Sequence, residues 1–465
     1  MVTPDLAHQV LEEVLRRGAE SAVVRLQERI YESIVYDTGV LRSYSVSRVI
    51  GLGVRASVGG GVGYAYSTSL DRESIVRAVE QAISIARVAG KYGKKVFAPV
   101  KPVKDSYRVE VKVDPFSVEP KAKVDLVKDV NTNSLRREGI VSAVTRMGLE
   151  RDRRIIVTSE GSEIEVDVAG VGVAHMAVAR YGATIERVGD RESYIGGYEY
   201  IERKDWNTFA EEIDRLALKA VQAKTPPPGT YVAVVDNEVV GLLLHEAFGH
   251  ASEGDGVVAG ASILKGRVGE KVASELITIV DAGLVEGGYP VPYDDEGVPK
   301  KKTVIVEKGV LRGYLTSRDS AHELGMEPTG NARAQDITFD ILVRQTNYYA
   351  EPGDWKVEEL FDGISFGIYL RGRGAMGGQV NPSVGTYTFS IGPSYIIRNG
   401  EPSELVRGVV VSGNILETLR EVDAVARDLK ITTSVFGGCG KGGQTVRVGD
   451  GGPHLRTRKI VVGGG

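Results

Sequence analysis

Two histidines and a glutamate stand close together near the middle of the chain, in the segment 245–250, which reads His-Glu-Ala-Phe-Gly-His. Neutral imidazoles are common zinc ligands, and a carboxylate beside the ion can take a proton from a water molecule. Zinc hydrolases combine these groups, most familiarly as His-Glu-x-x-His on one helix. The residue types therefore predict a zinc site with hydrolytic chemistry, in which His245 and His250 bind the ion and Glu246 lies beside the water.

The spacing of the two histidines requires a departure from a regular α-helix. At about 100° per residue, side chains four positions apart return to within roughly 40° of each other, whereas five positions leave them roughly 140° apart. His245 and His250 are five positions apart. We therefore expect either the end of a helix near Gly249 or a π-type turn, whose i→i+5 spacing aligns them. A helix with two unrelated histidines is the alternative.

A catalytic zinc site uses three protein ligands and leaves one position open, so a third ligand is needed. It could be an Asp, Glu, His or Cys. The single cysteine, Cys439, lies among glycines in the segment 436–444, where the backbone can approach an ion closely and the thiolate stays accessible. Cys439 is the candidate, and a small residue in a tight turn is the alternative. Glu253 and Asp255, just beyond His250, are the next candidates.

Two other functional classes fit the same residues. A non-catalytic zinc-binding scaffold, or a partner subunit of a peptidase complex, would enclose the ion with a fourth ligand, because structural zinc keeps no open position. A cysteine hydrolase would use Cys439 as its nucleophile, with His454 or His245 as the base.

The remaining histidines are weaker candidates. His322 and Glu323 form a second His-Glu pair, but no histidine follows within helical reach, so we predict a surface position. His454 follows a Gly-Gly-Pro turn and could orient a substrate. His8 and His175 are predicted to be structural.

The chain as a whole has 465 residues and a net charge of −4, which does not indicate nucleic-acid binding. No apolar run approaches the roughly 20 residues of a membrane helix. The N-terminus lacks the basic and apolar segments of a signal peptide. A lone cysteine excludes an intrachain disulfide and is typical of a reducing cytosol. We expect a cytoplasmic protein that binds neither nucleic acid nor membrane.

The Pro-rich segment 225–229 is the clearest boundary in the chain, because three prolines form a stiff, unpaired spacer. We predict an N-terminal domain over residues 1–225, with sub-segments 1–90 and 119–225, and a C-terminal domain over 229–465. Helices after Thr3, from about 71 to 88, after Glu119, and from a capping box at Thr208 and Glu211 alternate with strands. The lysine-rich segment 91–112 is predicted to be a solvated connection.

The second half is rich in glycine and β-forming residues. A buried strand at 231–235 leads to the helix that bears His245, which Asp236 or Asn237 can cap. The fold class is therefore α+β, with an N-terminal α/β domain of helices and antiparallel strands and a mainly β C-terminal domain carrying the zinc-binding helix. Further strands are predicted at 276–280, 303–306, 337–343, 386–391, 395–397 and 459–462, with one helix at 414–425.

Taken together, these motifs resemble the TldD branch of the TldD/PmbA family of metallopeptidases. The resemblance rests on His245-Glu246-x-x-x-His250 with a late Cys-Gly-Lys-x-Gly-Gln over residues 439–444. It extends over nearly the whole chain, through the segments 51–55, 63–66, 251–255, 294–297, 329–333, 344–347, 378–380, 407–408 and 451–453.

The resemblance implies one zinc ion held by His245, His250 and Cys439, with Glu246 as the general base that activates the zinc-bound water. It implies a metallopeptidase acting on peptides or unfolded polypeptides. It also implies a dimer with an enclosed site, either a homodimer or a heterodimer with a TldE/PmbA-like subunit. In the family that partner lacks the His-Glu pattern, so this chain would be the catalytic subunit.

Overall fold

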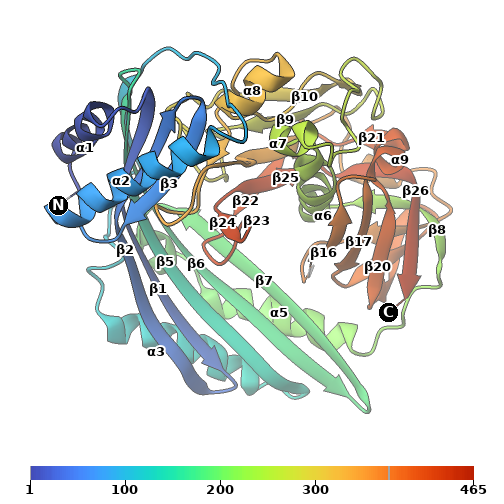
Figure 1. The fold of residues 1–465 in the computed structure, drawn as a ribbon. Helices are drawn as coiled ribbons and strands as arrows, with labels where there is room; N and C mark the ends of the chain where they lie inside the picture. The colour runs from blue at the N-terminus through green and yellow to red at the C-terminus, as the bar shows by residue number, and fades with distance from the viewer. Residues whose placement is uncertain (1, 375–376, 465) are drawn as a thin grey trace.

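The computed structural model describes residues 2–374 and 377–464. It confirms the predicted α+β class: a long curved sheet with helices forms the first half, and the second half is mostly strands (Figure 1). The strands of the first half are β1 (Ser21–Asp37), β2 (Val40–Val58), β3 (Gly61–Ser67), β4 (Lys104–Arg108), β5 (Ile140–Thr158), β6 (Glu163–Tyr181) and β7 (Thr184–Ile195).

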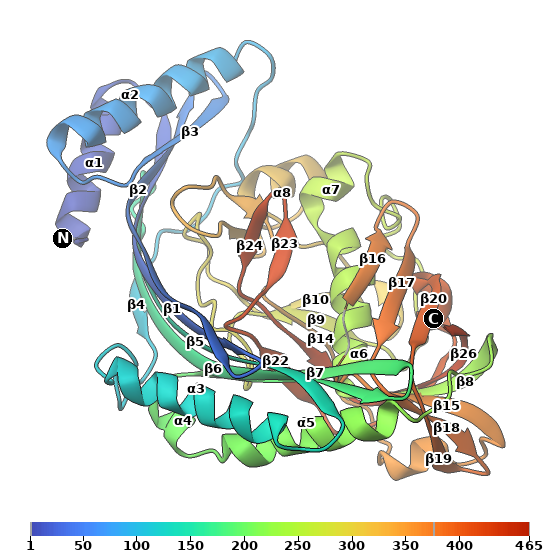
Figure 2. The same ribbon diagram turned by 90° about the horizontal axis from the view of Figure 1, so that it is seen from below.

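The first sheet joins the two predicted sub-segments of the N-terminal half. Its order is β3-β2-β1-β5-β6-β4, with β7 against β6, so β1 pairs along its length with β5. One group of helices packs near each end of these long strands, as Figure 2 shows. The helices are α1 (Pro4–Arg16), α2 (Arg72–Ala89), α3 (Pro120–Leu135), α4 (Glu199–Glu202) and α5 (Trp206–Ala220).

Two sheets organise the second half. One has the order β16-β17-β20-β26-β8-β15-β18-β19 with β21 against β26, and the other has the order β11-β10-β9-β14-β25-β22. The strands are β8 (Gly229–Val235), β9 (Ile279–Ala282), β10 (Thr303–Glu307), β11 (Val310–Leu311), β12 (Ala332–Arg333), β13 (Leu342–Val343), β14 (Asn347–Ala350), β15 (Phe366–Leu370), β16 (Gly377–Asn381), β17 (Thr386–Ile391), β18 (Ser394–Arg398), β19 (Glu401–Val406), β20 (Val409–Asn414), β21 (Val422–Val425), β22 (Lys430–Thr433), β23 (Cys439–Lys441), β24 (Gln444–Val446), β25 (Gly449–Gly452) and β26 (Leu455–Gly464).

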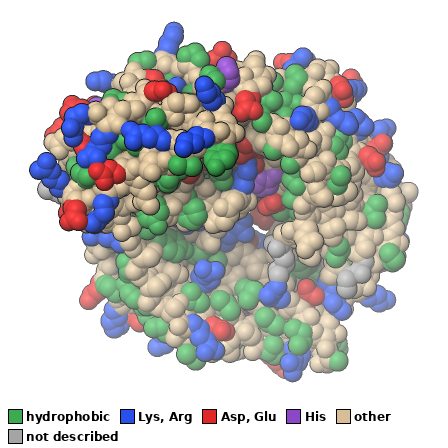
Figure 3. Space-filling view, viewed as in Figure 1, with side chains coloured by type: hydrophobic (Ala, Val, Ile, Leu, Met, Phe, Trp, Pro, Cys, Tyr) green, Lys and Arg blue, Asp and Glu red, His purple; other side chains and the backbone are tan. Residues whose placement is uncertain are grey.

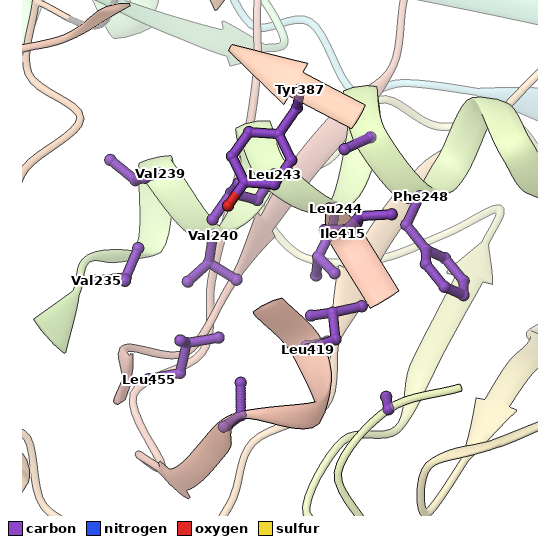
Figure 4. Close-up of a cluster of buried hydrophobic side chains, with 14 of the residues drawn as sticks. Val235, Val239, Val240, Leu243, Leu244, Phe248, Tyr387, Ile415, Leu419 and Leu455 are labelled. Carbon is purple, nitrogen blue, oxygen red and sulfur yellow. The ribbon is translucent and has the colours of Figure 1, made fainter. Parts of the chain in front are cut away.

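The largest core of the second half surrounds the helix that follows β8. Figure 4 shows apolar side chains of this helix, including Val240, Leu244 and Phe248, beside Ile415 and Leu419. Each buried aliphatic or aromatic side chain of this kind contributes about 1.5–3 kcal/mol, so the core fixes one side of the helix firmly. The helical segments are α6 (Asn237–Leu242), η1 (Leu243–Gly249), η2 (His250–Ser252), α7 (Gly254–Val258), α8 (Arg318–Leu324), η3 (Glu358–Phe361) and α9 (Ile415–Arg420).

Buried ion pairs connect the second half of the chain to the curved sheet of the first half. Asp295 accepts hydrogen bonds from Arg154 at 3.1 Å and from Arg25 at 3.4 Å, and Glu296 pairs with Arg55 at 2.5 Å. These acidic residues belong to the second half and the arginines to strands β1, β2 and β5. Removing one partner of a buried pair leaves an uncompensated charge, so these contacts hold the two halves in register.

The structure corrects several sequence-based expectations. Segment 337–343 is mostly turn, because Asp336 accepts the N–H of Thr338 and Asp340 that of Ile341. The helix expected over 414–425 ends at Arg420, and Val422–Val425 pairs with β26.

Two further corrections concern the first half. The fourth helix starts at Trp206 and its cap is Asp205, which accepts the N–H groups of Asn207 and Thr208. Thr208 is thus inside the helix. The lysine-rich connection contains one strand, β4, parallel to β6. Among the described residues, no helix is long and apolar enough to cross a membrane.

Candidate metal centre

The structure brings His245, His250 and Cys439 together. One ligand atom from each lies within 4.8 Å of the others. Cys439 is 189 positions beyond His250, and its Sγ lies 3.5 Å from His250 Nε2. His245 is 5% exposed and Cys439 is 2% exposed. The three predicted ligands therefore form one cluster, in which His245 and Cys439 are buried and His250 is partly buried.

A π-helical turn aligns the two histidines, as one of the two predicted alternatives requires. Asp236 caps α6 by accepting the N–H of Val239, and the helix continues into the π-turn Leu243–Gly249. The N–H of His250 donates to the carbonyl of His245, five residues earlier. The imidazole centroids are consequently 5.4 Å apart.

Gln345 supports the π-turn from the neighbouring strand region. Its amide nitrogen donates to the carbonyl of His245 at 3.0 Å. A Cβ at position 249 would lie 2.2 Å from Gln345 Oε1, so only glycine fits there without displacing Gln345. The sequence suggested Gly249 for its backbone freedom, whereas its φ of −60° is ordinary helix. The close approach of Gln345 is the reason for this glycine.

Cys439 opens the short β23–β24 hairpin, and both halves of the chain position it. The guanidinium of buried Arg344 donates to the carbonyl of Cys439. The preceding loop packs against glycines of β6: a Cβ at Gly172 would lie 3.0 Å from Val435 Cγ2, and one at Gly170 would lie 3.1 Å from Val435 Cγ1. The backbone of Cys439 is therefore held by a buried cation, and the loop before it by the N-terminal sheet.

Glu253 orients the second histidine. Its Oε2 lies 3.1 Å from His250 Nδ1, so His250 Nε2 is left to face Cys439. Lys441 donates to the same oxygen at 2.9 Å and to Asp255 at 2.7 Å. A carboxylate on the far nitrogen of a metal-binding imidazole fixes its tautomer and raises its basicity. Within the described part of the chain, the cluster contains neither Glu253 nor Asp255, the next candidates for the third ligand.

The electrostatics favour a thiolate. Burial raises the pKa of the Cys439 thiol, but the imidazoles of His245 and His250 outweigh it and lower the pKa to about 5. Burial likewise raises the pKa of Glu253, but His250 and Lys441 lower it to about 2. Burial lowers the pKa of His245, but the Cys439 thiolate raises it to about 9. The thiolate is the form of cysteine that binds metal.

The residues fit a zinc ion. Tetrahedral ligands about 2.0 Å (nitrogen) and 2.3 Å (sulfur) from zinc lie about 3.5 Å apart, which is the separation of Cys439 Sγ and His250 Nε2. His245 Nδ1 is buried and has no hydrogen-bond partner among the described residues. Such an atom is costly to bury unless something binds it or relieves it. Two imidazoles with one thiolate form a donor set that suits zinc.

Glu246 lies beside the cluster and faces a pocket. Its Oε2 is 3.8 Å from His250 Nε2, and its side chain is 37% exposed. The pocket has a volume of about 290 Å³, and its lining includes His245, Arg191 from β7, and Gly437 and Gly438 from the loop before Cys439. Figure 3 shows the molecular face hollowed between the two halves. Glu246 can therefore reach both the cluster and a bound molecule.

The other histidines lie elsewhere. His454 contacts Asp428 at 2.7 Å through Nδ1 and Tyr369 at 3.0 Å through Nε2, so both ring nitrogens are engaged away from Cys439. His322 is exposed on α8, as predicted. His175 is buried in a hydrogen-bonded group, and His8 lies 2.7 Å from Glu163.

Sequence reasoning missed four supporting residues, Gln345, Arg344, Lys441 and Arg191. Lys441 belongs to the glycine-rich motif around Cys439, and Arg344 and Gln345 precede a Thr-Asn pair in another shared motif. Neither motif indicates a contact by itself. The role of Glu253 had a usable signal, because a residue three positions after a helical histidine lies on its side of the helix.

Three family models match successive parts of the chain. Residues 22–86 match the PmbA/TldA metallopeptidase domain 1, residues 113–221 its central domain, and residues 228–464 its C-terminal domain. The last of these contains His245, His250 and Cys439.

Named proteins resemble the chain over most of its length. A protein of Methanothermobacter thermautotrophicus named metalloprotease is 36% identical over 446 residues, covering 96% of each chain. A zinc metalloprotease TldD homolog of Saccharolobus solfataricus is 36% identical over 309 residues, or 66% of this chain and 68% of its own. The crystal structure of TldE from Thermococcus kodakarensis has the same fold, with a TM-score of 0.78 and 20% identity over 99% of this chain and all of its own.

Proposed function

The chain belongs to the PmbA/TldD family of metallopeptidases, and on that basis we propose that it is a zinc-dependent peptidase acting on peptides or unfolded polypeptides. The observation that carries the proposal is the cluster of His245, His250 and Cys439 with Glu246 beside it at an open pocket. A zinc hydrolase uses three protein ligands and an open fourth position, whereas a structural zinc site is enclosed by four protein ligands.

His245, His250 and Cys439 would hold the zinc ion. When bound, zinc acts as a Lewis acid that polarises the scissile carbonyl and lowers the pKa of water towards about 7. His250 keeps its Nε2 directed at the cluster because Glu253 engages Nδ1. Arg344 and Gln345 hold the backbone carbonyls of Cys439 and His245, which keeps both residues in place.

Glu246 is the proposed general base. Its carboxylate takes a proton from the attacking water and then delivers it to the nitrogen of the leaving amine. The position suits both transfers, because Glu246 is partly exposed in the pocket and close to the histidine cluster. A cysteine nucleophile is less well supported, because Cys439 is almost fully buried and a bound ion would mask its sulfur.

The shape of the site supports an extended substrate. The pocket of about 290 Å³ lies between β7 of the first half and the helix α6–η1 of the second. A few residues of an extended chain fit such a space, whereas a folded domain is too large to enter it.

We further propose that the chain works as a dimer, with itself or with a TldE/PmbA-like subunit. The outer half of β2 supports this. Residues 40–48 pair with β1 on one side, and β3 begins to pair with β2 only from Leu52. Exposed apolar residues on this segment include Val40, Leu41, Tyr44 and Val46. An uncovered apolar strand edge is a candidate for pairing with another chain.

A free thiol and no disulfide also fit the proposed cytoplasmic location.

The proposal is tested on the purified chain. Zinc-loaded protein should cleave an unfolded polypeptide, and a chelator should stop the cleavage until zinc is restored. The same polypeptide in its folded form should resist. Undiminished cleavage in the chelator, with metal analysis confirming that zinc is gone, would contradict the zinc mechanism. Light scattering on the same sample reports whether a dimer forms.

A further inference from the structure

The helix that carries the histidines has a second face that looks into a groove. Val239, Val240, Leu243 and Leu244 pack into the core (Figure 4). Residues four positions apart share a helix face, so Glu238, Leu242 and Glu246 lie on one line along the opposite side. The pocket lining agrees, since Leu242 and Glu246 line the pocket at the metal cluster and Glu238 and Leu242 line the next one.

These two pockets adjoin each other along the helix, and together they are called the groove below. They share the lining residues Arg191, Leu242 and Asp450. The second pocket has a volume of about 600 Å³ and lies between β7, β22 and the start of α6. A chain that passes Glu246 can thus continue along the helix towards Glu238.

Glu238 has no hydrogen bond or ion pair with any described residue, unlike Asp190 and Glu192 of the same pocket. Asp190 pairs with Arg373 at 2.8 Å, and Glu192 pairs with Lys204. The base of the Glu238 side chain packs closely against Gly372, where an added Cβ would lie 2.2 Å from Glu238 Cβ. A carboxylate that is half-buried and unpaired is available to a ligand of opposite charge.

The charges around Glu238 favour the binding of a cation there. Burial raises the pKa of Glu238, the neighbouring carboxylates Asp190 and Asp236 raise it further, and Lys430 and Arg191 oppose them, with a net value of about 7. Neither cation comes within ion-pair distance of Glu238, so its charge stays poorly compensated in this groove.

We propose that Glu238 binds a cationic group of the peptide substrate, either the α-ammonium or a lysine or arginine side chain. This rests on the peptidase function proposed above. The eight residue steps from Glu238 to Glu246 span about 12 Å at the α-helical rise of 1.5 Å per residue. An extended peptide covers about 3.3 Å per residue. The cation therefore lies about three or four residues from the bond that is cleaved.

Binding tests the proposal separately from catalysis. The zinc-loaded Glu246→Gln variant is titrated calorimetrically with four alanine-based decapeptides. Each peptide carries either one lysine or one acetyl-lysine, and each of these two forms has either a free or an acetylated N-terminus. We expect the peptides with a cation to bind about fivefold to tenfold more tightly, as one partly buried ion pair provides. A preference that follows the lysine identifies a side-chain site, and one that follows the free N-terminus identifies an α-ammonium site.

Substitutions in the Glu246→Gln background assign the preference to Glu238. Adding Glu238→Gln should abolish the preference for peptides with a cation. Adding Glu238→Lys should instead produce a preference for a decapeptide that carries glutamate. Adding Glu323→Gln, the same change at an exposed, unpaired glutamate on α8, should leave the preference for a cation intact. Unchanged metal content and melting temperature show that each variant is folded. Equal binding of all four peptides, no binding of any, or a preference that survives Glu238→Gln would overturn the proposal.

Cleavage by the wild-type protein provides the second arm. Mass spectrometry of the products should place the cut three or four residues from the cation, and Glu238→Gln should scatter the cut sites. Cleavage with no relation to the cation overturns the Glu238 site and leaves the peptidase function standing. Cation-dependent binding without any cleavage supports the Glu238 site and contradicts the peptidase function.

Discussion

His175 and His250 each lie beside a carboxylate, in two different regions of the molecule; His175 is fully buried and the His250 side chain is 12% exposed. His175 lies on β6, where Nδ1 is 2.8 Å from Thr145 Oγ1 and Nε2 is 3.2 Å from Asp214 on α5. His250 lies at the end of the π-turn, where Nδ1 is 3.1 Å from Glu253 and Nε2 is 3.5 Å from the Cys439 sulfur. By residue type the two arrangements look alike.

The two regions differ in whether their buried polar atoms have hydrogen-bond partners. Asp214 also accepts hydrogen bonds from Ser134 and Arg137, and the side chains of His175 and Asp214 are fully buried. Around His250, by contrast, His245 Nδ1 lacks a partner among the described residues, and Glu246 opens onto a pocket. A network in which every polar atom has a partner stabilises the fold, whereas a buried ring nitrogen without a partner, close to a carboxylate at a pocket, is available for chemistry.

The largest effect is expected for Glu246→Gln. It should lower kcat at least about 1000-fold, because the amide cannot accept the proton of water. Zinc should stay bound at one ion per chain, since Glu246 is outside the ligand cluster. Elemental analysis and peptide hydrolysis measure the two quantities, with Glu323→Gln as the matched control. Loss of the metal would make Glu246 a ligand and end its assignment as the base.

Cys439→Ser should lower zinc occupancy and activity together, because a hydroxyl replaces a thiolate that the site favours. We expect a loss of activity of about 100-fold at limiting zinc, with partial recovery in excess zinc. In the wild type, alkylation of Cys439 should be slow until a chelator strips the metal. Stoichiometric zinc at wild-type affinity in the variant would show that the third ligand lies elsewhere.

Glu253→Gln should weaken zinc binding about 10-fold to 100-fold, because His250 loses the carboxylate that fixes its tautomer. The equivalent change in the other region, Asp214→Asn, should leave zinc affinity unchanged. A competition titration with a chromogenic chelator measures both variants. Equal zinc affinities for the two variants would remove the distinction drawn between the two histidine regions.

The smallest effect on catalysis is expected for His175→Ala. It should destabilise the fold by about 2–3 kcal/mol, because Thr145 and Asp214 lose a buried partner. Denaturant unfolding measures the loss. Zinc content and kcat of the folded variant should stay within about twofold of the wild type. A kcat loss comparable to that of Glu246→Gln, in protein shown to be folded, would make the buried network part of the reaction.

The local structure of the site was accessible from the sequence. The five-residue spacing of His245 and His250 restricted the helix to two possibilities, and the π-turn is one of them. Asp236 was recognised as a possible cap, and the strand Thr386–Ile391 was predicted at its observed bounds. These features depend on hydrogen bonds and periodicity within a few residues, which the sequence displays directly.

The sequence by itself determined which residue types are available for metal chemistry, and how the helix must turn to align two of them. Only the tertiary structure decided which of them meet, because the packing of Cys439 against His250 across 189 positions depends on the pairing of distant strands. It also decided that Gln345 requires glycine at position 249 and that Glu253 orients a histidine. It decided as well that both ring nitrogens of His175 have hydrogen-bond partners. Hydrogen-bond satisfaction and access to a pocket are properties of the packed chain, so no local pattern can reveal them.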